Sequence, residues 1–95
     1  MMRNDFGTPL NIASATTTVV KKGPGILVAI IVNKAVASSV YTIYDNTAAS
    51  GTKIATVTMP GTLLASQMVL PFNCKFTTGL TVVTSSTDDI TVIYA

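Results

Sequence analysis

The stretch from Val40 to Val57, VYTIYDNTAASGTKIATV, constrains the fold more than any other part of the chain. Two runs of alternating side-chain character, 40–45 and 53–57, flank a segment of Asn, Thr, Ala, Ser and Gly, which predicts a β-hairpin with a long loop. Tyr41 and Ile43 point to the same face of the first run. Because the remaining apolar runs also have strand length, we expect them to stack beside or against this hairpin.

The composition favours β structure along the whole chain. Thr, Ile and Val fill 35 of the 95 positions (16, 8 and 11, respectively), and β-branched residues suit a pleated sheet but lose side-chain freedom in a helix. Glu, a good helix former, is absent. At this length one domain is expected. We predict an all-β fold, an antiparallel β-sandwich that is jelly-roll-like and has about seven to eight strands.

Turn residues divide the chain into short strands. The strands are expected at 15–22, 26–33, 40–45, 53–57, 68–72, 80–84 and 90–94. Pro71 confines one of them to a sheet edge or a bulge, and residues 62–67 form either one helical turn or a crossing between sheets. The core is expected to come from Ile26 to Val32, Val40 to Tyr44, Ile54 to Val57, Leu80 to Val83 and Ile90 to Tyr94. Truncation should be most costly at Val28, Ile30, Ile43, Val82 and Val92.

The run from Ile26 to Asn33 is apolar on both faces. Alternation places Val28 and Ile30 on one face and Leu27 and Ile31 on the other. One face is expected to pack on the opposing sheet and the other on a neighbouring subunit or a loop. Charged residues make up only 11% of the chain, against about 25% in a typical soluble domain. We therefore predict a homo-oligomer, with a trimer favoured over a dimer.

Residues 1–14, MMRNDFGTPLNIAS, show neither the two-residue period of a strand nor the period of a helix. We predict an extended N-terminal arm over 1–14 and a β-sandwich domain over 15–95, with a disordered terminus as the alternative. A segment of this kind tends to order on a partner. Its predicted contact residues are Arg3, Phe6, Leu10 and Ile12.

No group of residues indicates catalysis. His is absent, although general acid–base catalysis near neutral pH most often uses it. Cys74 therefore lacks the base that a nucleophilic thiol needs, and it is expected to pack as a small apolar residue. Asp88 and Asp89 would face opposite ways in a strand and, like Asp45, are interpreted as turn residues. We predict no enzymatic activity and no catalytic, cofactor-binding or metal-binding residues.

The charge pattern argues against a nucleic acid partner, and the length of the apolar runs argues against a membrane partner. The net charge of +2 comes from scattered residues, whereas nucleic-acid-binding surfaces cluster basic residues on one face. The apolar run 26–32 is far shorter than the roughly 20 residues that span a bilayer. Tyrosines form sugar-stacking platforms in some proteins, but Tyr41 and Tyr44 would lie on opposite faces of a strand. Packing is the favoured interpretation of these residues and of Tyr94.

Two segments give the chain a resemblance to a known group of proteins. They are Tyr44 to Val57 (YDNTAASGTKIATV) and Phe76 to Ala95 (FTTGLTVVTSSTDDITVIYA). From Lys21 onward, over about three quarters of the chain, the sequence resembles small β-sandwich virion proteins of tailed bacteriophages, several of which are capsid decoration or cement proteins with jelly-roll-like folds. The shared motifs are structural, since Tyr-Asp-Asn opens a hairpin loop, Ser-Gly closes it and Phe-Thr-Thr-Gly-Leu-Thr enters a strand.

The resemblance implies a function. We expect a structural virion protein of a tailed bacteriophage that decorates or cements the outer capsid surface as a homo-oligomer, with the major capsid protein as its partner. It would be synthesised in the bacterial host cytoplasm and located on the virion, and its N-terminal arm would lie across the capsid shell or an adjacent subunit. The alternative is a carbohydrate- or receptor-binding β-sandwich module of a phage tail or fibre, because similar domains occur there.

Overall fold

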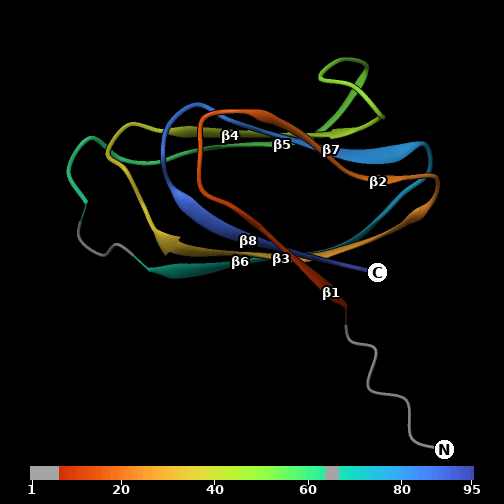
Figure 1. The fold of residues 1–95 in the computed structure, drawn as a ribbon, viewed down its shortest axis with the longest axis horizontal. Coiled ribbons are helices and arrows are strands. Elements are labelled where there is room, and N and C mark those ends of the chain that lie inside the picture. The colour runs from red at the N-terminus through yellow and green to blue at the C-terminus, as the bar shows by residue number, and fades with distance from the viewer. Residues whose placement is uncertain (1–6, 64–66) are drawn as a thin grey trace, which may run out of the picture.

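The computed structural model describes residues 7–63 and 67–95. Within these ranges the chain forms eight β-strands and no helix, and the strands make two four-stranded antiparallel sheets stacked face to face (Figure 1). The strands are β1 (Thr8–Ile12), β2 (Thr17–Lys22), β3 (Gly25–Lys34), β4 (Val40–Asp45), β5 (Thr52–Thr58), β6 (Met68–Phe76), β7 (Gly79–Thr84) and β8 (Asp89–Tyr94). The predicted all-β sandwich is therefore confirmed.

The strand order is β1-β8-β3-β6 in one sheet, called sheet A, and β2-β7-β4-β5 in the other, called sheet B. The antiparallel pairs are nested, because β4 pairs with β5, β3 with β6, β2 with β7 and β1 with β8. The chain is thus one long hairpin folded over on itself into two sheets, which is a jelly-roll arrangement. The hairpin predicted from Val40 to Val57 forms its tip.

The core lies between the inward faces of the two sheets. Its apolar side chains with no exposed surface are Leu27, Ile30, Val32, Tyr41, Ile43, Phe76, Leu80, Val82, Ile90 and Val92. Four of the five positions predicted to be most costly on truncation, Ile30, Ile43, Val82 and Val92, are among them. Along β4 and β8 these residues alternate with less buried ones, as the two-residue period of a pleated strand requires.

The fifth predicted position, Val28, is wrong because a β-bulge interrupts the alternation in β3. Leu27 and Ala29 pair with adjacent residues of β8, so the pairing skips Val28. The extra residue turns Leu27 toward the core and leaves Val28 partly exposed. Leu27, rather than Val28, therefore shares the core face with Ile30.

The first strand corrects the predicted arm over 1–14 and the domain boundary at 15, because the sandwich begins at Thr8. β1 pairs with β8 along its length, from Thr8 opposite Tyr94 to Ile12 opposite Ile90. Pro9 is tolerated because β1 is an edge strand. The paired residues are 78 or more positions apart in the chain, so no local pattern reveals the pairing.

The strand β6 lies at the other edge of sheet A, as Pro71 predicts, but it extends to Phe76 rather than ending at Phe72. Asn73 adopts a left-handed backbone conformation (φ 51°) where the register with β3 shifts. Asn tolerates this conformation better than most residues, so the strand continues past the irregularity. Of the segment predicted as a helical turn or a crossing, residues 64–66 lie outside the described ranges.

Candidate interaction surface

The outward face of sheet A is unusually apolar. Two cross-strand rows run over β1, β8, β3 and β6 in that order, the first formed by Pro9, Ile93, Ala29 and Pro71 and the second by Asn11, Thr91, Ile31 and Val69. Six of these eight residues are apolar. They point outward because they alternate with inward residues such as Ile30 and Val92, which are fully buried.

A water-facing antiparallel sheet normally presents polar residues on its outer face. Here Val69 is 61% exposed and Ile26, earlier on β3, is 44% exposed. Pro9 and Pro71 are exposed as well. Sheet B lies on the opposite side of the core, so no described strand covers this face. Exposed apolar surface of this kind is typical of protein contact sites, which makes this face a candidate interaction surface.

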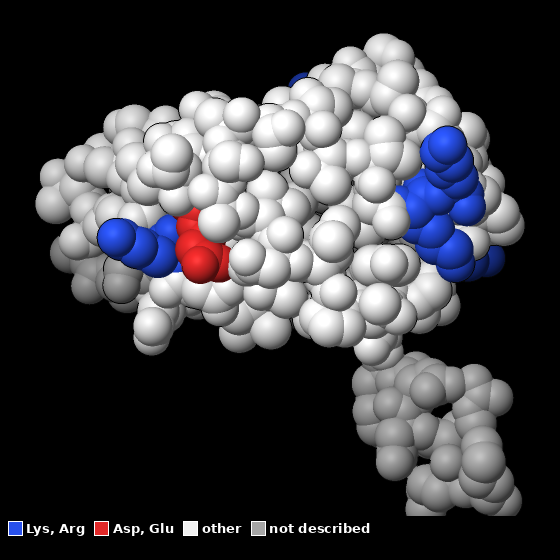
Figure 2. Space-filling view, in the orientation of Figure 1, with Lys and Arg blue, Asp and Glu red and all other residues white. Residues whose placement is uncertain are grey.

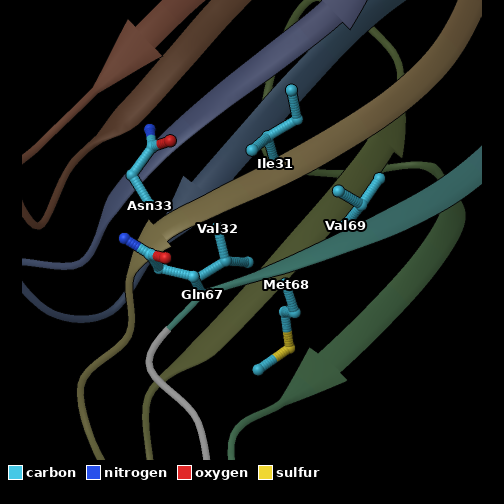
Figure 3. Close-up of a pocket in the computed structure, with 6 residues that line it drawn as sticks. All are labelled: Ile31, Val32, Asn33, Gln67, Met68 and Val69. Atoms are coloured by element: carbon cyan, nitrogen blue, oxygen red, sulfur yellow. The ribbon is translucent and has the colours of Figure 1, made fainter.

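An open pocket of about 400 Å³ lies where β3 meets the start of β6 (Figure 3). Its lining residues are Ile31, Val32, Asn33, Gln67, Met68 and Val69. Ile31 and Val69 belong to the outer apolar rows, and the amides of Asn33 and Gln67 add hydrogen-bonding groups. The lining suits an apolar side chain of a partner together with its adjacent backbone.

A small polar network includes the two polar members of the second row, Asn11 and Thr91. Asp89 Oδ1 accepts hydrogen bonds from the side-chain amides of Asn11 (2.6 Å) and Asn33 (3.1 Å), and Asn33 also donates to Thr91 Oγ1 (3.0 Å). The bond from Asn11, and then that from Asn33, holds the pKa of Asp89 below its usual value. The network joins β1, β8 and β3 and gives the apolar face a polar margin, as the rims of protein interfaces have.

The outward face of sheet B differs in composition. Its two rows are formed by Thr17, Val83, Thr42 and Thr56 and by Val19, Thr81, Tyr44 and Lys53. Four of the eight residues are threonine. Thr17 and Thr56 are exposed, and their hydroxyl groups keep the surface hydrated without adding charge, whereas Thr81 is fully buried and donates its hydroxyl to the Asn46 carbonyl (2.7 Å). Both outer faces thus carry few charges, but the rows of sheet A are mainly apolar, whereas half of the residues in the rows of sheet B are threonine.

A buried carboxylate holds one end of the sandwich together. Asp88 has no exposed surface, and its Oδ2 accepts hydrogen bonds from the Tyr41 hydroxyl (2.5 Å), the Ser39 hydroxyl (2.6 Å) and the Val36 N–H (2.9 Å). Burial acts to raise the pKa of Asp88, but these bonds outweigh it and hold that pKa below its usual value. Burial, and then the bond to Asp88, raises the pKa of Tyr41 well above its usual value.

This cluster joins the β3–β4 connection to the β7–β8 loop, which is a structural role. The interpretation of Asp88 as a turn residue misses its burial, because its donors lie 47 to 52 positions away. Among the described residues, Asp88 Oδ1 has no hydrogen-bond partner. The carboxylate is therefore held through one oxygen.

A second carboxylate caps the β6–β7 turn at the other end of β4. Asp45 accepts hydrogen bonds from the backbone N–H groups of Thr77, Thr78 and Gly79 at 2.8 to 3.4 Å. The bond from Thr78, and then that from Thr77, lowers the pKa of Asp45. A Cβ at Gly79 would lie 3.0 Å from the Lys21 carbonyl oxygen, so this close approach favours glycine. These bonds join the Tyr44–Val57 segment to the start of the Phe76–Ala95 segment.

Of the four predicted contact residues, only Leu10 and Ile12 lie in the described part of the chain. Arg3 and Phe6 lie outside the described residues. Ile12 is only 5% exposed and belongs to the core, so its prediction as a partner contact is wrong. Leu10 is half-buried on the same inward face of β1. The outer rows of sheet A were missed, and the only signal for them was the apolar character of both faces of β3.

The other residues considered from the sequence have structural positions. Cys74 is half-buried and packs against the core, as predicted. Tyr41 is buried, Tyr44 points outward from sheet B and Tyr94 lies in sheet A. The three tyrosines therefore do not make one platform.

Charged side chains lie mainly toward the two ends of the face seen in Figure 2, with a wide uncharged surface between them. In residues 7–63 and 67–95, no three His, Cys, Asp or Glu side chains gather as metal ligands. The same part of the chain contains no helix with the length and apolar character needed to cross a bilayer. No protein-family model, curated protein or solved structure matches this chain.

Proposed function

We propose that this protein is a structural component of a tailed bacteriophage virion, which decorates or cements the outer capsid surface as a homo-oligomer and has no enzymatic activity. Its partner is the major capsid protein, and neither nucleic acid nor a membrane takes part. The observation that supports a structural role is the apolar outer face of sheet A. The resemblance of the Tyr44–Val57 and Phe76–Ala95 segments supports the phage assignment.

A broad, weakly charged face suits attachment to another protein better than capture of a small ligand. Protein interfaces have an apolar centre, depleted of charge, within a polar rim. Ile31, Ile93 and Val69 supply such a centre, and the network around Asp89 supplies part of the rim. Since many copies attach to one particle, even weak contacts add up to firm decoration.

The attachment surface in this proposal differs from the predicted arm. Ile12 is needed inside the sandwich, so deleting residues 1–14 would remove β1 and expose the core. The role of Arg3 and Phe6 stays a prediction. The capsid contact is therefore assigned chiefly to the outer rows of sheet A and to the pocket beside them.

Binding of the purified protein to undecorated capsids tests the proposal. Val69→Asp places a charge at a position that is 61% exposed, so the fold should tolerate it. Because a charge in the centre of an interface is costly, we expect binding to weaken by about 30-fold or more. Thr42→Asp, on the outer face of sheet B, is the matched control and should bind as the unchanged protein does.

Co-sedimentation with capsids measures both variants, and imaging of the particle locates the bound protein. Equal binding by the two variants would exclude the outer face of sheet A as the attachment site. A failure of the unchanged protein to bind any capsid would count against decoration. Binding to a glycan array would instead support the carbohydrate-binding alternative, which the separated positions of Tyr41, Tyr44 and Tyr94 do not favour.

A further inference from the structure

The four edge strands of the sandwich differ in how they are protected from pairing with another chain. Exposed edges are commonly blocked by proline, charge or irregularity. The edges of sheet A contain Pro9 in β1 and Pro71 in β6, and β2 contains Lys21, Lys22 and a bulge. The strand β5 contains no proline, and its only charge and its only bulge lie in its first half, before Ala55. The second half of β5 is therefore an unprotected edge.

The direction of the backbone groups along this half follows from the hydrogen bonds at its end. Met59 donates its N–H to the Ser39 carbonyl (2.7 Å), which continues the register in which Val57 lies opposite Tyr41. Antiparallel strands alternate between residues that bond to the neighbouring strand and residues that do not. Ala55, Val57 and Met59 thus face β4, whereas the N–H and C=O groups of Thr56 and Thr58 point away from the sheet.

We propose that this edge pairs with the same edge of a second copy of the chain, about a twofold axis at Val57. In this register Thr56 of one copy lies opposite Thr58 of the other, and each such pair exchanges two hydrogen bonds. The two four-stranded sheets B join into one continuous eight-stranded sheet. The proposal deepens the self-association in the proposed function and does not depend on the capsid partner.

A second copy is the occupant that the strand itself indicates. The outward N–H and C=O groups of Thr56 and Thr58 lie two residues apart on one strand. A twofold rotation therefore places the donors of each copy opposite the acceptors of the other. The rotation also places outward side chains opposite outward ones and inward side chains opposite inward ones, since Ala55 then lies opposite Met59. Lys53, the only charge of β5, lies beyond the paired segment, so the two copies do not repel each other there. A twofold interface of this kind is the commonest form of self-association.

Cysteine cross-linking tests the register directly. In a Cys74→Ser background, Val57→Cys places one thiol of each copy at the twofold axis. Residues opposite each other in a non-hydrogen-bonded pair have Cα atoms about 4.5 Å apart, which a disulfide spans. Thr52→Cys, at the far end of the same strand, is the control, since its two copies would be roughly 30 Å apart. We expect a covalent dimer from the first variant under mild oxidation and no covalent dimer from the second.

A backbone change provides a second, independent readout. Thr56→Pro removes an N–H that points away from the sheet, so the hydrogen bonds to β4 are kept, while Thr56→Val keeps the N–H and removes only the hydroxyl. Sedimentation should show a dimer for Thr56→Val and dimerisation about 10- to 100-fold weaker for Thr56→Pro, which loses two of the four bonds.

The proposal is overturned if the unchanged protein sediments as a monomer at all concentrations, or if it forms a trimer that Val57→Cys does not cross-link. Equal cross-linking at positions 52 and 57 overturns it as well. Because these measurements use the isolated protein, they are separate from the capsid-binding test. Dimerisation without capsid binding would support the edge pairing and count against decoration.

Discussion

Two carboxylates, Asp88 and Asp45, link distant segments of the chain near opposite ends of β4, but they differ in burial. Each accepts hydrogen bonds from a segment far away in the chain, and each has its pKa held below the usual value by those bonds. Asp88 is fully buried and accepts from two side-chain hydroxyls and one backbone N–H through a single oxygen. Asp45 is partly exposed and accepts only from the turn formed by residues 77–79.

We expect burial, rather than the number of hydrogen bonds, to set how much each carboxylate contributes to stability. When a buried acceptor is removed, its donors stay buried and unpaired, which costs the full desolvation penalty. When an exposed acceptor is removed, water takes its place. Substitutions at the two ends of β4 should therefore differ in their effects on the free energy of unfolding.

Asp88→Ala should have the largest effect. It leaves the Tyr41 hydroxyl, the Ser39 hydroxyl and the Val36 N–H without their acceptor in the core. We expect the free energy of unfolding to fall by about 3 to 5 kcal/mol, a large part of the stability of a domain of this size. Urea unfolding measures the change. Asp89→Ala, at the adjacent outward position, is the control, and a similar loss in both variants would contradict the role of burial.

Tyr41→Phe should have the next largest effect. The change keeps the buried ring and removes one of the three donors to Asp88, so we expect a loss of about 1 to 3 kcal/mol in the free energy of unfolding. The same urea experiment applies. Tyr44→Phe, on the outer face of sheet B, should change stability by less than about 0.5 kcal/mol. If the two tyrosine variants behave alike, the Tyr41–Asp88 bond does not stabilise the fold.

The pH dependence of stability should reveal the lowered pKa of both carboxylates. Each has a lower pKa in the folded chain than the value of about 3.9 expected when unfolded, so the unfolded state binds protons first on acidification. The stabilisation is therefore present above about pH 4 and is lost as the pH falls through the folded pKa. The chain has only four side-chain carboxyls, so single Asn variants can show how much each one contributes to the fall in unfolding free energy at low pH. Asp88→Asn and Asp45→Asn should each flatten the fall in unfolding free energy, and an unchanged slope in both would contradict the lowered pKa values.

Asp45→Ala should have the smallest effect on global stability, below that of Tyr41→Phe. Its local effect should still be clear, because the N–H groups of Thr77 and Thr78 lose their acceptor. We expect faster hydrogen exchange at these two amides, while Val82 in the neighbouring strand stays protected. Asp45→Asn retains a side-chain oxygen and should show an intermediate exchange rate. Uniformly faster exchange across the sandwich would mean that the cap supports the whole fold.

Local patterns were sufficient to predict the elements of this fold. Alternation and turn residues located the β4–β5 hairpin and placed six of the seven predicted strands close to their observed bounds, whereas β6 extends four residues farther. The β-branched composition indicated an all-β sandwich. Pro71 correctly indicated an edge or bulge position for its strand. Each of these signals depends on backbone preferences within a few residues, so it can be recognised without knowing what the segment contacts.

The features that were missed depend on contacts between distant segments. Thr8–Ile12 becomes a strand because β8, at the other end of the chain, supplies its hydrogen-bonding partner. A bulge in β3 exchanges the roles of Leu27 and Val28, and Asp88 is buried because its donors come from another loop. The apolar face of sheet A exists only once β1, β8, β3 and β6 lie side by side. Such pairing and burial arise when segments tens of residues apart come together in the fold. The local periodicity of one segment does not indicate which other segment it will contact.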